Sequence, residues 1–90
     1  MIETELEVVN RLGLHARAAA KLVHVTGAFE SRVVLVSEDG EEIDAKSILG
    51  ILLLAAGQGT RLGLRCDGPD EKQACAAVEK IFAERFGEGE

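Results

Sequence analysis

His15 and Arg17 are the residues of this 90-residue chain whose types and spacing most favour chemistry. His15 comes immediately before a predicted helix, where the first backbone N–H groups lack partners and the helix end carries partial positive charge. A neutral imidazole is a nucleophile, and an arginine fork matches the oxygens of a phosphate group. A phosphoryl group on His15 would then contact the amides of Ala16 and Arg17 and the Arg17 guanidinium. The same spacing is also typical of a solvated surface histidine or a helix cap.

The other histidine and the cysteines do not show the spacing of a metal site or a disulfide framework. Cys66 and Cys75 lie nine residues apart in no recognised motif, so we expect buried free thiols. Together with His15 and His24 they lack finger-like or ribbon-like ligand spacing, and we expect no metal. His24 follows Ala20 by one helical turn, and we interpret it as an exposed residue, with contact to a partner as the alternative.

Composition excludes several classes of function. The formal net charge is −6, with no cluster of Lys or Arg, which argues against nucleic acid or an anionic membrane as a partner. The longest apolar stretch, residues 48–57, is about half the length that spans a bilayer, and the N-terminus does not resemble a signal peptide. We therefore expect a cytoplasmic protein. Gly57-Gln58-Gly59 precedes a predicted strand, so it is not a phosphate loop, and we expect no cofactor.

Alternating apolar and polar residues predict strands over residues 2–8 and 60–66. Two shorter runs, residues 31–37 and 41–45, are joined by Glu38-Asp39-Gly40, whose Asp-Gly pair suits a tight hairpin. These segments predict four strands.

Apolar residues at three-four spacing predict a helix over residues 16–26 and another that begins after Asp67-Gly68-Pro69-Asp70. A short helix over residues 47–55 would start with Ser47 as its N-cap, although Gly50 weakens that prediction. The order β-α-β-β-α-β-α predicts an α+β fold, one antiparallel sheet with its helices on a single face. We expect one domain over residues 1–90, with residues 87–90 as a frayed tail.

The string Gly13-Leu14-His15-Ala16-Arg17-Ala18-Ala19 resembles the active-site signature of the HPr family. These are the histidine-containing phosphocarriers of the bacterial phosphoenolpyruvate-dependent phosphotransferase system. The resemblance extends along nearly the whole chain and includes Lys46-Ser47-Ile48-Leu49-Gly50 and Gly68-Pro69-Asp70-Glu71. Ala18 departs from the family pattern, which usually has Pro at this position, and we expect slightly weaker preorganisation of the helix start.

The resemblance implies a stoichiometric phosphoryl carrier, not an enzyme, that works in sugar uptake or its regulation. Enzyme I would phosphorylate His15 on Nδ1, Arg17 would help to hold the phosphoryl group, and an enzyme IIA-type domain would receive it. Ser47 would be a regulatory site for an HPr kinase/phosphorylase. The implied fold is an open-faced β-sandwich of four antiparallel strands and three helices, and we expect a monomer.

The short helix is apolar around nearly its whole circumference, yet a helix lying on a sheet buries only one side. We expect Ile48, Leu49 and Leu52 to remain exposed and, with Ala20, to form a partner-binding patch beside His15. One alternative function is a regulatory binding protein that acts through phospho-Ser47 and this apolar surface. Another is an unrelated α+β domain that binds a small molecule, which leaves the string around His15 unexplained. The sequence leaves open whether the carrier serves a sugar or a nitrogen-type branch.

Overall fold

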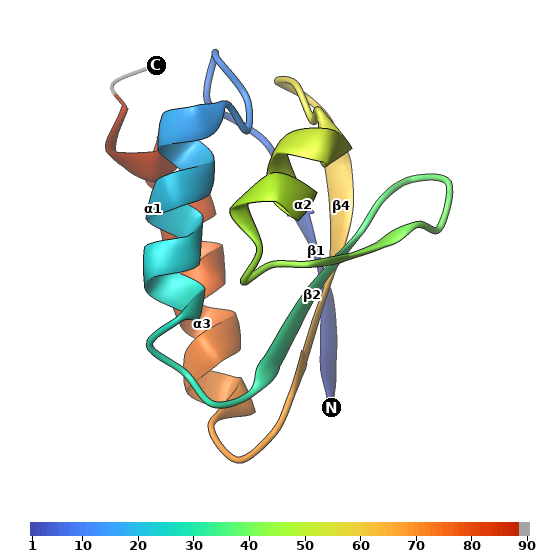
Figure 1. Cartoon of the computed structure of the whole chain (residues 1–90), viewed down its shortest axis with the longest axis vertical. Coiled ribbons are helices and arrows are strands. Elements are labelled where there is room, and N and C mark those ends of the chain that lie inside the picture. The colour runs from blue at the N-terminus through green and yellow to red at the C-terminus, as the bar shows by residue number, and fades with distance from the viewer. Residues whose placement is uncertain (89–90) are drawn as a thin grey trace.

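The computed structural model describes residues 1–88, and its helices cover one side of a single sheet (Figure 1). The elements along the chain are β1 (Ile2–Glu7), α1 (Ala16–Thr26), β2 (Arg32–Val36), β3 (Glu42–Asp44), α2 (Ile48–Leu54), β4 (Arg61–Asp67), α3 (Glu71–Ala83) and the short 3₁₀ helix η1 (Arg85–Gly87). The predicted order and the predicted α+β class are confirmed. The sequence analysis did not predict η1.

The sheet is antiparallel throughout and has the strand order β1-β4-β2-β3. Leu6 of β1 pairs with Leu62 of β4, and Leu64 of β4 pairs with Leu35 of β2, so apolar side chains of adjacent strands meet on the inner face. The turn between β2 and β3 uses Gly40 at a φ of 89°, a conformation that glycine adopts without strain. The Asp-Gly turn is therefore confirmed.

An aliphatic core fills the space between the sheet and the helices. Alternation along β1 and β4 places every second side chain inward, and the stripes of α1 and α3 face the sheet. The buried residues of these elements include Leu6, Leu62, Leu64, Cys66, Ala18, Ala19, Leu22, Ala74, Val78 and Phe82. No helix within residues 1–88 has both the length and the apolar character that crossing a membrane requires.

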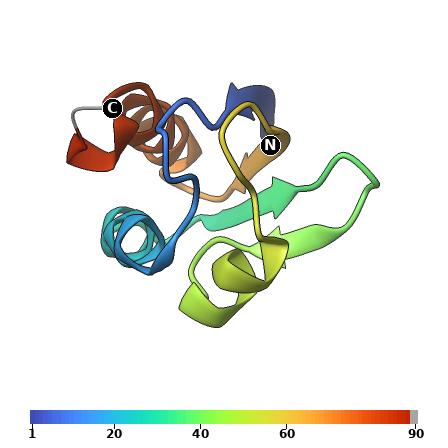
Figure 2. The same ribbon diagram turned by 90° about the horizontal axis from the view of Figure 1, so that it is seen from above.

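Helices α1 and α3 lie side by side and run in opposite directions (Figures 1 and 2). Because of this direction, the end of α3 and the following η1 come back beside the start of α1. Phe86 of η1 is 1% exposed and packs edge-on against Phe82 with 4.9 Å between ring centroids. Lys21 of α1 donates a hydrogen bond from Nζ to the Phe86 carbonyl oxygen at 2.7 Å. These contacts bind the last described segment to α1.

The structure differs from the expectation that residues 87–90 form a frayed tail. Gly87 ends η1, its amide donates to the Glu84 carbonyl at 3.0 Å, and the Glu88 side chain bonds to Asn10 and His15. The expectation was wrong for Gly87 and Glu88, because burial of Phe86 carries the backbone toward the start of α1. Residues 89 and 90 lie outside the described part of the chain.

Candidate functional site

The loop before α1 is fixed by contacts with the segment that follows α2. Leu14 is buried and its amide donates to the Ala56 carbonyl oxygen at 2.9 Å. Gly13 has a φ of 69°, and a Cβ at this position would lie 2.5 Å from the Ala56 carbonyl oxygen. Both observations require glycine at position 13. The loop therefore delivers His15 to the start of α1 in a defined position.

His15 is the N-cap of α1, and its side chain takes the place of the usual small polar cap. Its backbone is extended, with φ −75° and ψ 178°, and its ring Nδ1 accepts a hydrogen bond from the Arg17 amide at 3.2 Å. The side chain is 28% exposed, so a partner can reach the ring. The Arg17 amide, one of the two predicted phosphate-binding amides, thus already contacts the predicted nucleophilic atom.

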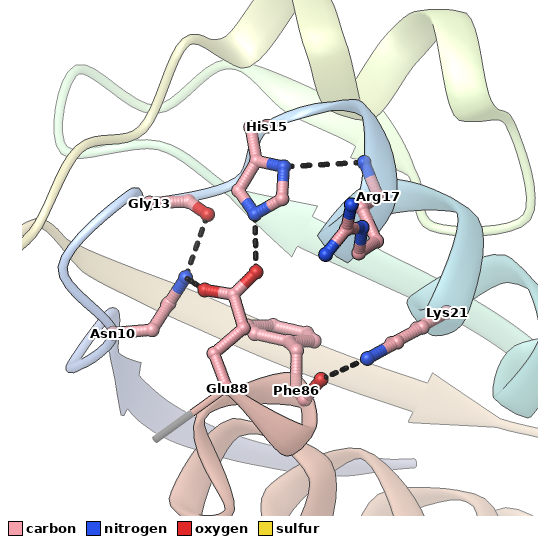
Figure 3. Close-up of polar contacts among 7 residues, drawn as sticks. All are labelled: Asn10, Gly13, His15, Arg17, Lys21, Phe86 and Glu88. Carbon is pink, nitrogen blue, oxygen red and sulfur yellow. Dashed lines mark hydrogen bonds and ion pairs between the residues drawn. The ribbon is translucent and has the colours of Figure 1, made fainter. Parts of the chain in front are cut away.

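The second ring nitrogen of His15, Nε2, contacts the Oε2 atom of Glu88 (Figure 3). The other carboxylate oxygen of Glu88 accepts a hydrogen bond from Asn10 Nδ2 at 3.1 Å. Hydrogen bonds from the His15 ring and from the Asn10 amide lower the pKa of Glu88 below its usual value. The sequence analysis missed both Glu88 and Asn10, and no local pattern connects positions 73 residues apart.

Arg17 is exposed on the first turn of α1, and its side chain folds back toward the His15 ring (Figure 3). Within residues 1–88, no hydrogen bond or ion pair engages its guanidinium. A cation without a partner beside the predicted nucleophile is able to pair with a phosphoryl group. Ala18, at the position where the family usually has proline, is fully buried.

The predicted docking patch on α2 is only partly as expected. Ile48 and Leu49 are 42% and 66% exposed, and Ala20 on α1 is exposed as well. Leu52 instead packs half-buried against the core, whereas Leu53 is 74% exposed. Packing of α2 against α1 and β3 turns Leu52 toward the core and leaves Leu53 outside. Leu12 in the loop before His15 adds another exposed apolar side chain, at 67%.

The remaining candidates have mainly structural roles. Ser47 is the N-cap of α2, and its Oγ accepts a hydrogen bond from the Gly50 amide at 3.1 Å, as predicted. His24 is exposed, and Cys66 and Cys75 are buried free thiols. Burial raises the pKa of Cys66 to about 12, which keeps this thiol protonated. Residues 1–88 contain no group of His, Cys, Asp and Glu side chains arranged to hold a metal ion.

The sequence matches a known family along most of the chain, including the residues around His15. The family described as "PTS HPr component phosphorylation site" matches residues 2–84. The chain belongs to the HPr family. Its relatives include the phosphocarrier protein HPr of Cupriavidus necator, which is 49% identical over 90 residues that cover 100% of both chains. The HPr of Xylella fastidiosa is 52% identical over 88 residues, or 98% of each chain.

Solved HPr structures share the fold. An HPr from Thermoanaerobacter tengcongensis superposes with a TM-score of 0.94 at 36% identity and covers 100% of both chains. An HPr from Bacillus anthracis gives a TM-score of 0.83 at 30% identity, over 88% of this chain and 93% of that one. The open-faced sandwich that the resemblance implied is therefore confirmed, and the chain is a phosphocarrier component of the phosphotransferase system.

Proposed function

We propose that His15 accepts a phosphoryl group from phosphoenolpyruvate through enzyme I and passes it to an enzyme IIA-type domain, in sugar uptake or its regulation. The chain acts as a stoichiometric carrier that is consumed and regenerated, not as an enzyme. The observation that carries this proposal is the ring of His15, held at the start of α1 with Nδ1 beside the Arg17 amide at 3.2 Å. A neutral ring nitrogen at the positive end of a helix suits both attack on a phosphoryl group and retention of the product.

The transfer requires a small rearrangement at Nδ1. The Nδ1 lone pair forms the bond to phosphorus as the bond between phosphorus and the phosphoryl donor breaks. The hydrogen bond from the Arg17 amide to Nδ1 is then released, and this amide and that of Ala16 become donors to the phosphoryl oxygens. The Arg17 guanidinium adds a charge-assisted contact to the same oxygens. Attack by the acceptor reverses the sequence and restores the free ring.

The test of this function is phosphorylation by purified enzyme I and phosphoenolpyruvate. We expect the protein to gain one acid-labile phosphoryl group, measured by intact-mass spectrometry, and to lose it when an enzyme IIA-type domain is added. Acid lability separates phosphohistidine from a phosphoester on serine. A protein that gains no phosphoryl group under conditions that phosphorylate a known HPr would refute the proposal.

The surface that docks these partners consists of Leu12, Ile48, Leu49 and Leu53, the exposed apolar side chains on α2 and on the loop before His15. Helix α2 packs beside α1, the helix that His15 caps (Figure 2). Exposed leucine and isoleucine beside a reactive group is typical of an interface. Ala20 extends the surface along α1.

Leu49→Asp is expected to weaken binding of enzyme I about tenfold while it changes the free energy of unfolding by less than about 0.5 kcal/mol. Leu49 is 66% exposed, so the substitution removes little core packing, yet it places a charge where an apolar partner surface must dock. Titration calorimetry and denaturant unfolding measure the two effects. Ala28→Asp, at an exposed position two residues beyond the end of α1, is the control for added charge. Loss of stability with unchanged binding would show that Leu49 belongs to the core.

Ser47 acts as a regulatory site in this proposal, with an HPr kinase/phosphorylase as the modifying partner. Ser47→Asp is expected to retain the fold, because aspartate also caps a helix, and to slow phosphorylation of His15 several-fold. The added negative charge must be desolvated when the apolar surface docks. Ser47→Asn is the matched control, since asparagine caps equally well without charge. Equal phosphorylation rates for the two variants would restrict Ser47 to capping.

The cytoplasm as location, the monomeric state and the absence of nucleic acid and membrane as partners complete the proposal. A regulatory binding protein that acts through phospho-Ser47 is the alternative function. The partly exposed His15 ring, and the Arg17 guanidinium that no residue within 1–88 engages, favour the carrier, because the alternative uses neither residue.

A further inference from the structure

The two ring nitrogens of His15 have partners of opposite hydrogen-bonding character (Figure 3). Nδ1 faces the Arg17 amide, which can only donate, so Nδ1 must carry a lone pair. Nε2 faces the Glu88 carboxylate, which accepts when ionised, so Nε2 must carry the proton. Both contacts select the same tautomer of the neutral ring, with Nε2–H protonated and the lone pair on Nδ1.

Glu88 is held in place by contacts independent of His15. Asn10, fully buried, donates from Nδ2 to Glu88 Oε1 at 3.1 Å and to the Gly13 carbonyl oxygen at 2.8 Å. The amide of Asn10 cannot be turned over without presenting its own oxygen to these two acceptors. The Glu88 side chain itself is only 15% exposed.

The backbone on either side of this contact is also anchored. Phe86 lies in the core two residues before Glu88, and Lys21 bonds to its carbonyl oxygen at 2.7 Å. Arg85 and Phe86 have φ values of 56° and 54°, a backbone conformation that costs a non-glycine residue about 1–3 kcal/mol each. This strained turn redirects the chain from the axis of α3 toward His15. Strained backbone persists only where surrounding contacts hold it, so this turn indicates that the segment is fixed in place.

We propose that Glu88 is a positioning residue that holds His15 in the Nε2–H tautomer and thereby directs the phosphoryl group to Nδ1. When Nδ1 bonds to phosphorus, the proton stays on Nε2 and the ring becomes cationic, and the Glu88 carboxylate stabilises that cation. When the acceptor attacks, the bond between Nδ1 and phosphorus breaks and the neutral ring leaves with Nε2–H unchanged. No proton has to move in either direction. The tautomer is a property of the free protein. Only the effect of Glu88 on the phosphoryl group rests on the proposed function.

The first measurement is NMR of the ring nitrogens of His15 in the free protein, at a pH at which the ring is neutral. We expect wild type to be almost entirely the Nε2–H tautomer and Glu88→Ala to be a mixture of both tautomers. Glu88→Gln should retain most of the preference, because its amide oxygen still accepts from Nε2–H. Glu84→Ala, an exposed carboxylate on the same segment, is the control and should match wild type.

The second measurement uses potassium phosphoramidate, a small donor that releases ammonia and needs no docking partner. Glu88→Ala is expected to react about tenfold more slowly than wild type, the size typical of losing a group that orients a histidine. Phosphorus NMR should find phosphate only on Nδ1 in wild type and Glu84→Ala, and partly on Nε2 in Glu88→Ala. Glu88→Gln should recover the Nδ1 product with part of the rate, because it keeps the hydrogen bond and lacks the charge.

The two measurements separate this inference from the proposed function. Wild-type tautomer and product distributions in Glu88→Ala would overturn the role of Glu88, even if all variants accept phosphate from enzyme I. A tautomer change in Glu88→Ala together with a wild type that enzyme I cannot phosphorylate would refute the proposed function and support the positioning role. Thermal unfolding of each variant verifies that the compared proteins are folded.

Discussion

His15→Ala is expected to accept no phosphoryl group from enzyme I and phosphoenolpyruvate while it remains folded. The substitution removes the nucleophile, and no other described side chain at the start of α1 offers a lone pair beside the Arg17 amide. Loss of the N-cap hydrogen bond should cost about 1 kcal/mol, or roughly 4–8 °C in Tm for a domain of this size. Mass spectrometry of the reaction and a thermal melt measure the two effects.

Two control variants make this result specific. His24→Ala removes an exposed histidine from the same helix and should be phosphorylated like wild type. His15→Asn removes the nucleophile but supplies a good N-cap, so it should be unreactive and more stable than His15→Ala. Phosphate found on His24 in the His15 variants would contradict the assignment of the site.

Phe86→Ala is expected to lower the free energy of unfolding by about 3–5 kcal/mol, as truncation of a buried phenylalanine commonly does. In the native protein Phe86 is 1% exposed and packs edge-on against Phe82. The substitution removes this contact but leaves the strained backbone at position 86. The total free energy of unfolding of a native domain is about 5–15 kcal/mol, so this substitution would remove a large share of the stability. Denaturant unfolding measures it, with the exposed Glu84→Ala as control.

The same variant connects stability with the site. Without the anchor of Phe86, the carboxylate of Glu88 should leave His15, and the ring should show the tautomer mixture expected for Glu88→Ala. A stability change below about 1 kcal/mol would show that η1 does not belong to the core, since a buried aromatic side chain costs far more to remove. In that case the anchoring of Glu88 would need another explanation.

Local patterns were sufficient for most of the fold. The alternation in β1 places Glu3 and Glu5 on the solvent face and Leu6 inward, and the three-four spacing in α1 turns Ala19 and Leu22 toward the sheet. Ser47 as a cap and Gly40 in the hairpin follow from backbone preferences of single residues. These features depend on neighbours within a few positions along the chain, so the sequence by itself determined them.

His15 and Arg17 could also be selected from the sequence, because a nucleophile, a helix start and a cation lie within three residues. The choice between Leu52 and Leu53 as the exposed residue could not be made in this way. A seven-residue helix that is apolar on all sides has no stripe to fix its rotation, and only packing of α2 against α1 and β3 decides which leucine is buried.

The partner of Nε2 was decided by the tertiary structure alone. Glu88 meets His15 because α3 runs antiparallel to α1, Phe86 enters the core, and two residues with positive φ turn the backbone back over the start of α1. Each of these causes acts between segments distant in sequence, and none leaves a periodic signal in the residues near the C-terminus. The sequence by itself therefore determined the helix that begins after His15 and was enough to single out His15 as the proposed nucleophile. Only the packing of α3 and η1 on α1 determined which group the Nε2 atom of His15 contacts.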